Sequence, residues 1–112
     1  MNIQIYAHKR DFEVQKAERY FKERRIPYQF VDLGKHAMGL KELESVMRQV
    51  GLQNMIALSD KDWQSHYVSQ LIDPQAALEA LRDQPKLLKT PIVRNGKLAT
   101  IGFQPDVWAQ WK

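Results

Sequence analysis

One stretch near the end of the chain constrains the fold more than any other. Residues 89–97 read Lys-Thr-Pro-Ile-Val-Arg-Asn-Gly-Lys, in which a proline opens a β-branched run and Asn95-Gly96 ends it. Asn-Gly between apolar runs favours a two-residue turn in which both residues have positive φ. The stretch therefore predicts a β-hairpin with residues 98–103 as the return strand. Because Pro91 lacks an N–H, it is expected at a strand start or an edge, and the bond before it is open to both the trans and the cis form.

The first third of the chain predicts a strand, a helix and a second strand. Residues 2–6 alternate polar and apolar side chains as a strand does, and Asp11 suits the N-cap of a helix that stops near Arg25. Residues 28–33 are rich in β-formers and predict the second strand. Because a helix separates the two strands, we expect them to run parallel with a right-handed crossover.

The rest of the chain before and after the hairpin is predicted to be mainly helical. Apolar residues at helical spacing, ended by Gly51, predict a helix over residues 40–50. Asp73-Pro74 is a typical helix start, and Gln84-Pro85 ends that helix. A short helix is also predicted over residues 62–71, and a terminal helix from residue 105 is expected to pack Trp108 and Trp111 in or beside the core.

Length and composition indicate a single domain over residues 1–112. The chain has 112 residues, 44% of them hydrophobic, which is enough for one sizeable core. The sequence has no run of eighteen apolar residues and no basic-then-apolar leader, so neither a membrane span nor a signal peptide is predicted. We therefore expect a cytoplasmic protein with no membrane partner.

The chain contains no cysteine, and this absence excludes more kinds of chemistry than any motif in the sequence supports. Disulfides, thiolate nucleophiles, iron–sulfur clusters and cysteine-ligated zinc are all excluded. The three histidines, His8, His36 and His66, show none of the spacings of a zinc-binding helix. No metal site is therefore predicted.

The net charge of +4 raises the question of nucleic-acid binding. Most of the excess lies in residues 8–25, which hold seven Lys or Arg and four acidic residues. In this segment Glu18 with Lys22, and Arg19 with Glu23, are spaced i,i+4. That spacing is typical of a solvated helix face, so we favour a solvated surface over a nucleic-acid footprint.

The order of the predicted elements resembles the thioredoxin fold of the ArsC/Spx (arsenate reductase, glutaredoxin-like) family. The resemblance covers essentially the whole chain and implies an α/β fold. It implies a mixed four-stranded sheet with two parallel first strands, an antiparallel hairpin and a helical insertion. It rests on short strings found in the same order: Ile5-Tyr6, Lys16-Ala17-Glu18-Arg19, Ile26-Pro27-Tyr28, Thr90-Pro91-Ile92-Val93-Arg94-Asn95-Gly96-Lys97, Ile101-Gly102 and Pro105-Asp106-Val107-Trp108.

The resemblance also implies a site at the start of the first helix, where the family carries a nucleophilic Cys that faces a cis-proline. In this sequence that position falls on Asp11. A carboxylate there can cap the helix and stay ionised, but it cannot form a mixed disulfide. Reductases of the family also hold the oxyanion with arginines, and two of those positions are Thr90 and Phe103 here. Arsenate reduction by this chain is therefore not expected.

Asp11 has a second interpretation, as an acyl-phosphate nucleophile or a general base. Either role would need Mg²⁺ ligands or a paired carboxylate nearby, whereas the neighbouring loop supplies His8, Lys9 and Arg10. We therefore expect Asp11 to be a plain N-cap.

Taken with the resemblance, the vacated nucleophile position predicts a redox-inactive family member that works as a binding or regulatory module. The resemblance implies that in Spx members this fold serves as a regulator that binds RNA polymerase. The expected ligand here is a protein or extended acidic peptide, a small anion or glutathione, with no other cofactor. We call the expected binding surface the former active-site face, and it comprises His8, Lys9, Arg10, Asp11, Thr90, Pro91, Gly102 and Phe103.

The alternative is an enzyme that needs no thiol of its own. It would be arsenate reductase-like, or a glutathione-dependent oxidoreductase or transferase in which the substrate supplies every sulfur. Turnover of arsenate or of a model disulfide by the chain with glutathione and glutaredoxin would distinguish this enzyme from the binding module.

Overall fold

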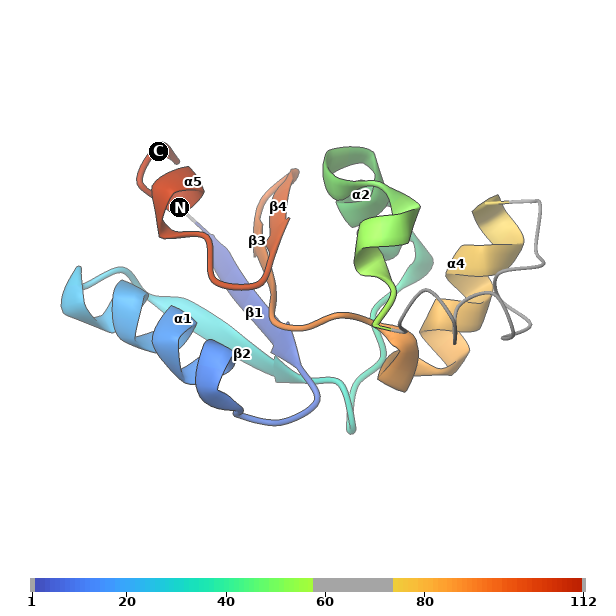
Figure 1. The fold of residues 1–112 in the computed structure, drawn as a ribbon, viewed down its shortest axis with the longest axis horizontal. Helices are drawn as coiled ribbons and strands as arrows, with labels where there is room; N and C mark the ends of the chain where they lie inside the picture. The colour runs from blue at the N-terminus through green and yellow to red at the C-terminus, as the bar shows by residue number, and fades with distance from the viewer. Residues whose placement is uncertain (1, 58–73, 112) are drawn as a thin grey trace.

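Four strands form one mixed sheet at the centre of the fold (Figure 1). The computed structural model describes residues 2–57 and 74–111. The strands lie in the order β2-β1-β3-β4, with the bounds β1 (Ile3–Ala7), β2 (Tyr28–Asp32), β3 (Ile92–Asn95) and β4 (Leu98–Ile101). β1 and β2 pair in parallel, and the other two pairs are antiparallel. The predicted mixed sheet is therefore confirmed.

Helices lie on both sides of the sheet (Figure 1). α1 (Phe12–Glu23) and the one-turn α5 (Pro105–Trp108) lie on one side. α2 (Leu40–Val50) lies on the other side, with α4 (Pro74–Asp83) next to it. None of the helices in the described residues is long and apolar enough to cross a membrane.

Two short 3-10 turns complete the side of the sheet that α2 covers. They are η1 (Leu52–Met55) and η3 (Pro85–Leu87), and an antiparallel bridge between Ile56 and Leu88 joins the segments that follow them. α2 ends at Gly51 in a positive-φ conformation (φ 86°), as the sequence predicts. The helix predicted over residues 62–71, and the cap predicted at Asp73, lie outside the described residues.

The alternation of β1 divides the core into two clusters, one on each side of the sheet. Odd-numbered Ile3 and Ile5 turn toward α1 and α5, whereas even-numbered Tyr6 turns toward α2. The cluster on the α1 side includes Ile3, Ile5, Ala17, Tyr20, Phe21, Val93, Trp108 and Trp111. Trp108 and Trp111 are only 2% and 9% exposed, which confirms their predicted place in or beside the core.

The hairpin forms as predicted, but its turn is shifted by one residue. Asn95 is the last residue of β3 and pairs with Leu98, so the two turn residues are Gly96 and Lys97. Of the turn residues only Gly96 has positive φ (61°), and the return strand ends at Ile101 rather than at Phe103. A two-residue turn with glycine first needs positive φ only at that glycine, which explains why Asn95 stays in the strand.

The predicted pairing of Glu18 with Lys22 on a solvated face is wrong. Glu18 is buried, with 7% of its surface exposed. Its carboxylate accepts a hydrogen bond from the Tyr28 hydroxyl at 2.9 Å and forms an ion pair with Arg10 at 3.1 Å. Tyr28 belongs to β2, so the partners of Glu18 are set by the packing of α1 against the sheet, and not by the next turn of the helix.

Candidate functional site

Asp11 is the N-cap of α1, as the sequence predicts. Its backbone is extended (φ −75°, ψ −173°), and its carboxylate accepts a hydrogen bond from the Val14 N–H at 3.0 Å. The Gln15 N–H donates to the Asp11 carbonyl at 3.0 Å and so begins the helical hydrogen bonding. The helix therefore uses the carboxylate itself, and its negative charge lies at the positive end of the helix dipole.

The Thr90–Pro91 peptide bond is cis, and it immediately precedes β3, which pairs with β1 in the sheet. The Gly102 N–H donates to the Pro91 carbonyl at 2.9 Å. Gly102 has positive φ (81°), and a Cβ added to it would lie 3.4 Å from a carboxylate oxygen of Glu13, in the first turn of α1. Pro91, Gly102 and the start of α1 are therefore neighbours.

Thr90 presents an unpaired stretch of backbone. Thr90 is half-buried, and within residues 2–57 and 74–111 no group forms a hydrogen bond with its backbone N–H or its carbonyl. A ring nitrogen of His8 lies 3.2 Å from the Leu88 carbonyl. This contact connects the loop after β1 to the segment that precedes Thr90. A backbone with free donor and acceptor groups can pair with an extended peptide.

Two exposed aromatic side chains lie near the Lys16 ammonium, close to the start of α1. Phe12, the first residue of α1, is 72% exposed, and Phe103, which follows Gly102, is 36% exposed. The Lys16 ammonium lies 5.0 Å from the centre of the Phe12 ring and 5.7 Å from that of Phe103. Phe103 also packs edge-on against Trp108, with ring centres 5.6 Å apart, so its position is fixed by the core.

The structure separates the residues of the predicted basic loop. Lys9 is exposed. Arg10 instead turns toward β2, where its guanidinium lies 4.0 Å from the centre of the Phe30 ring and 3.1 Å from Glu18. Of the predicted site residues, Asp11, Pro91, Gly102 and Phe103 therefore surround the first turn of α1, whereas the charged group of Arg10 faces a different surface.

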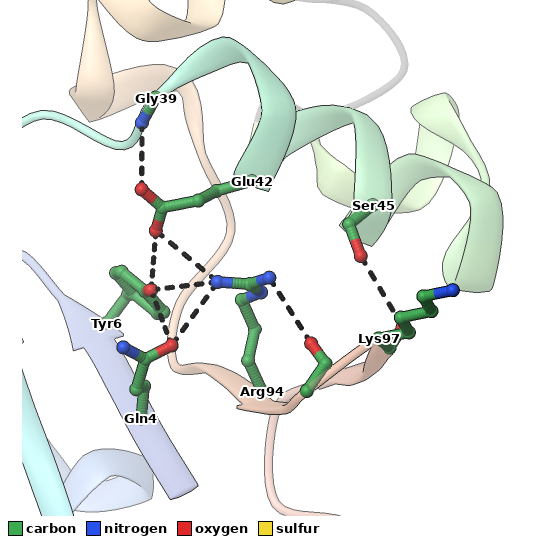
Figure 2. Close-up of polar contacts among 8 residues, drawn as sticks. Gln4, Tyr6, Gly39, Glu42, Ser45, Arg94 and Lys97 are labelled. Carbon is green, nitrogen blue, oxygen red and sulfur yellow. Dashed lines mark hydrogen bonds and ion pairs between the residues drawn. The ribbon is translucent and has the colours of Figure 1, made fainter. Parts of the chain in front are cut away.

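A second polar group, which the sequence reasoning missed, joins β1, β3 and α2 (Figure 2). The Tyr6 hydroxyl donates to Glu42 at 2.6 Å. One nitrogen of the Arg94 guanidinium contacts Glu42 at 3.4 Å, the Tyr6 hydroxyl at 3.2 Å and the Gln4 amide oxygen at 3.2 Å. The other terminal nitrogen donates to the Gly96 carbonyl, while Nε is buried and has no partner in the described part of the chain.

Burial and the bond to Glu42 raise the pKa of Tyr6 to about 12. Tyr6 therefore stays protonated and acts as a hydrogen-bond donor at neutral pH. The contacts that join Glu42, Arg94 and β1 connect residues 36 to 90 positions apart in the sequence, so no local spacing reveals them. This group fastens α2 to the sheet.

The former active-site face offers recognition groups more than reactive ones. Its groups can pair a peptide backbone at Thr90, contact an apolar side chain at Phe103 and attract a negative charge with Lys9. The neighbouring Phe12 and Lys16 add a second ring and a second cation. Within residues 2–57 and 74–111, no three His, Cys, Asp or Glu side chains are arranged to hold a metal ion.

Comparisons with known proteins agree with this fold. A relative, the global transcriptional regulator Spx 2 of Oceanobacillus iheyensis, is 24% identical over 128 aligned residues, which span all of this chain and 94% of the relative. The solved structure of an arsenate reductase from Vibrio cholerae is 20% identical, covers 96% of this chain and 94% of its own, and has a TM-score of 0.75. A structure of an arsenate reductase (ArsC)-related protein from Brucella melitensis is 21% identical, covers 99% and 94%, and has a TM-score of 0.66.

The structural likenesses show a shared thioredoxin-like fold, and at such low identity they do not by themselves assign an activity. The family assignment rests on a different comparison, in which the family model for the ArsC family matches residues 6–111. That range extends from β1 to the end of the described chain and includes the Asp11 cap, the cis Thr90–Pro91 bond and Gly102. The chain, although it has no cysteine, belongs to the ArsC family.

Proposed function

We propose that this chain is a redox-inactive member of the ArsC family that works as a binding module through the former active-site face. One observation carries the proposal: the Asp11 carboxylate caps α1 at the position that the family resemblance gives to the nucleophilic Cys. A carboxylate there stabilises the helix, but it cannot form a disulfide with a substrate or with glutathione.

The surroundings of Asp11 support binding rather than a loss of the whole site. The Thr90–Pro91 bond is cis, and Gly102 bonds to Pro91. The unpaired backbone of Thr90 can accept an extended peptide, and the exposed Phe103 ring can contact one of its apolar side chains. The module would therefore bind an extended segment of a protein partner at this face, and the similarity to a transcriptional regulator supports a regulatory role.

The first experiment tests the absence of catalysis. Purified protein is assayed with glutathione and glutaredoxin for reduction of arsenate and of a model disulfide. We expect no turnover above background, and we expect Asp11→Cys to gain at most a thiol that glutathione can modify, with a pKa lowered by the helix N-terminus. Turnover by the unmodified chain would instead support the enzyme in which the substrate supplies every sulfur.

The second experiment tests binding with two matched apolar positions. Peptides are selected from a displayed library of unstructured sequences, and the affinity of an enriched peptide is then measured for Phe103→Ser, Thr90→Arg and Leu98→Ser. Leu98 is as exposed as Phe103 (40% against 36%) but lies at the other end of β4. We expect the first two variants to weaken binding about tenfold and Leu98→Ser to leave it unchanged. Failure to select any peptide, or equal losses at Phe103 and Leu98, would contradict the proposal.

A further inference from the structure

A groove runs along the free edge of the sheet, on the opposite side of α1 from Phe103. It has a volume of about 710 Å³ and lies between α1 and β2. Its basic lining is Arg10, Lys22 and Arg25, and its apolar lining comes from Ile26, Pro27 and the rings of Tyr28 and Phe30. We call this surface the β2-edge groove. It shares none of its lining residues with the former active-site face except Arg10.

The strand β2, which borders this groove, carries backbone groups that have no partner in the described part of the chain. Among the strands of residues 2–57 and 74–111, β2 lies at the edge of the sheet and pairs with β1 alone. The Leu33 N–H donates to the Ala7 carbonyl, and in a parallel ladder the groups that face β1 then belong to every second residue, Gln29 and Val31. The N–H and carbonyl groups of Tyr28 and Phe30 therefore point away from the sheet. No described residue bonds them.

The charge of the groove is positive and only partly compensated. Arg10 is neutralised by Glu18, at 3.1 Å. Lys22 and Arg25 are exposed, and neither makes an ion pair with any residue that the structure describes. An edge strand with two unpaired cations beside it has the features that favour an acidic strand.

Arg25 stands in a conformation that favours glycine. Its φ is 57°, and it is the only non-glycine residue with positive φ in residues 2–57 and 74–111. The Arg25 N–H bonds to the Lys22 carbonyl at 3.1 Å and the Ile26 N–H bonds to the Phe21 carbonyl at 2.9 Å, which is the pattern of a helix end that usually places glycine at this position. Arginine is unfavourable there for the backbone, so the helix end alone does not account for this residue, and its side chain lines the groove.

We propose that the β2-edge groove binds an acidic, extended peptide of a partner protein, which adds to the sheet as a fifth strand beside β2. The peptide backbone pairs with the free groups of Tyr28 and Phe30. Alternate acidic side chains on the face toward α1 meet Lys22 and Arg25. This site is separate from the one in the proposed function, and it gives the molecule a second surface for a partner.

The aromatic rings of the groove are less suited to nucleic acid than to a peptide. Base stacking needs a free ring face, but the guanidinium of Arg10 already covers Phe30 at 4.0 Å. The Tyr28 hydroxyl donates a hydrogen bond to Glu18, and the Tyr28 ring packs near Phe21. Basic residues beside aromatic rings therefore do not act here as a stacking platform.

The test uses a labelled peptide, acetyl-Thr-Glu-Val-Glu-Thr-Glu-Val-amide, and the full chain. Binding is measured by fluorescence anisotropy, and amide hydrogen exchange is measured with and without the peptide. We expect the peptide to slow exchange at the Tyr28 and Phe30 N–H groups, and to change Gln29 and Val31 little because they already bond to β1. The same peptide with three internal amides N-methylated should not bind, since it lacks the donors that a new strand needs.

Two pairs of variants test the residues that carry the charge. Lys22→Gln and Arg19→Gln each remove one cation from α1, but only Lys22 lines the groove. We expect Lys22→Gln and Arg25→Gly each to weaken binding about threefold, and Arg19→Gln to leave it unchanged. Phe103→Ser should also leave it unchanged, which separates this site from the former active-site face.

The outcomes that would overturn the proposal are specific. They are unchanged exchange at Tyr28 and Phe30 with bound peptide, equal affinity for the N-methylated peptide, or equal losses for Lys22→Gln and Arg19→Gln. Tighter binding of a single-stranded oligonucleotide than of the peptide would assign the groove to nucleic acid instead.

Discussion

Two carboxylates, one on each side of the sheet, have the same kinds of partner. Glu18 of α1 bonds to the Tyr28 hydroxyl and pairs with Arg10, while Glu42 of α2 bonds to the Tyr6 hydroxyl and pairs with Arg94. In both groups a helix carboxylate meets a tyrosine of the sheet. We call them the Glu18 group and the Glu42 group.

The two groups differ in which ion is buried. In the Glu18 group the carboxylate side chain is 10% exposed and the arginine 57%. In the Glu42 group the arginine is 15% exposed and the carboxylate 38%. A buried ion depends on its partner far more than an exposed one, because water can replace the partner only at the surface. The two groups should therefore respond differently to the same kinds of substitution, which the first three of the following four predictions test.

The largest expected effect is the loss of stability in alkali. Burial, and the bond to Glu18, raise the pKa of Tyr28 to about 12, as burial and Glu42 do for Tyr6. A tyrosine ionises at about 10 in the unfolded chain, so this stability is fully present below pH 10 and is lost as the pH rises to about 12. For the buried Tyr6 we expect a loss of about 2.5 kcal/mol.

Urea unfolding between pH 9 and 12 checks this prediction in Tyr6→Phe and Tyr28→Phe. The free energy of unfolding should fall less steeply with pH in Tyr6→Phe than in the wild type. The change should be smaller in Tyr28→Phe, because solvent reaches the partly exposed Tyr28. A larger change in Tyr28→Phe would break the comparison between the two groups.

The second prediction removes the negative charge from each group. Glu42→Gln leaves the buried guanidinium of Arg94 without an anion, so we expect a loss of about 2 kcal/mol in the free energy of unfolding. Glu18→Gln leaves Arg10, which water can hydrate, and should cost about 1 kcal/mol or less. Urea titration at pH 7 measures both. Equal losses would show that exposure of the arginine does not decide the cost.

The third prediction removes the positive charge from the Glu18 group. Arg10→Gln leaves the buried Glu18 with only the Tyr28 hydroxyl, and the variant should lose about 1.5 kcal/mol. Lys9→Gln is the matched control, since Lys9 is exposed and forms no ion pair within the described residues, and it should change stability by less than about 0.5 kcal/mol. If both variants unfold at the same urea concentration, Arg10 contributes nothing to the group.

The smallest effect is a gain. Arg25→Gly relieves the positive φ at the end of α1 and should raise the free energy of unfolding by about 0.5 to 1 kcal/mol. Arg24, one residue earlier, has negative φ, and its guanidinium lies 3.7 Å from the centre of the Tyr20 ring. Arg24→Gly removes that contact and relieves no strain, so it should lower the melting temperature. A variant at position 25 that melts below the wild type would show that Arg25 does not strain the backbone.

Features decided by neighbouring residues could be predicted from the sequence. The cap at Asp11 and the end of α2 at Gly51 depend on a few adjacent positions, and both are found where the spacing places them. The turn shows where this reasoning is limited. Asn95-Gly96 and Gly96-Lys97 contain the same glycine, and only the register of β3 against β4 decides between them.

Features decided by packing could not be predicted. Helical spacing predicts Lys22 as the partner of Glu18, whereas the observed partner Tyr28 comes within reach only when β2 packs on the helix. The direction of Arg10 depends on Phe30 in the same way. The Glu42 group joins residues from β1, α2 and β3, and its carboxylate and guanidinium are 52 positions apart. The position of the former active-site face follows from the family resemblance and not from residue spacing.

The Glu42 group also has a consequence for the accuracy of strand pairing. In β1 the even residues Gln4 and Tyr6 face α2, and Gln4 lies directly opposite Arg94 of β3. A slip of β1 by one residue would turn both polar side chains toward Phe21 and Trp108 and would present two isoleucines to the guanidinium. A one-residue misalignment would therefore leave polar groups unmatched inside the protein, so that an interaction of modest strength selects this alignment over those shifted by one residue.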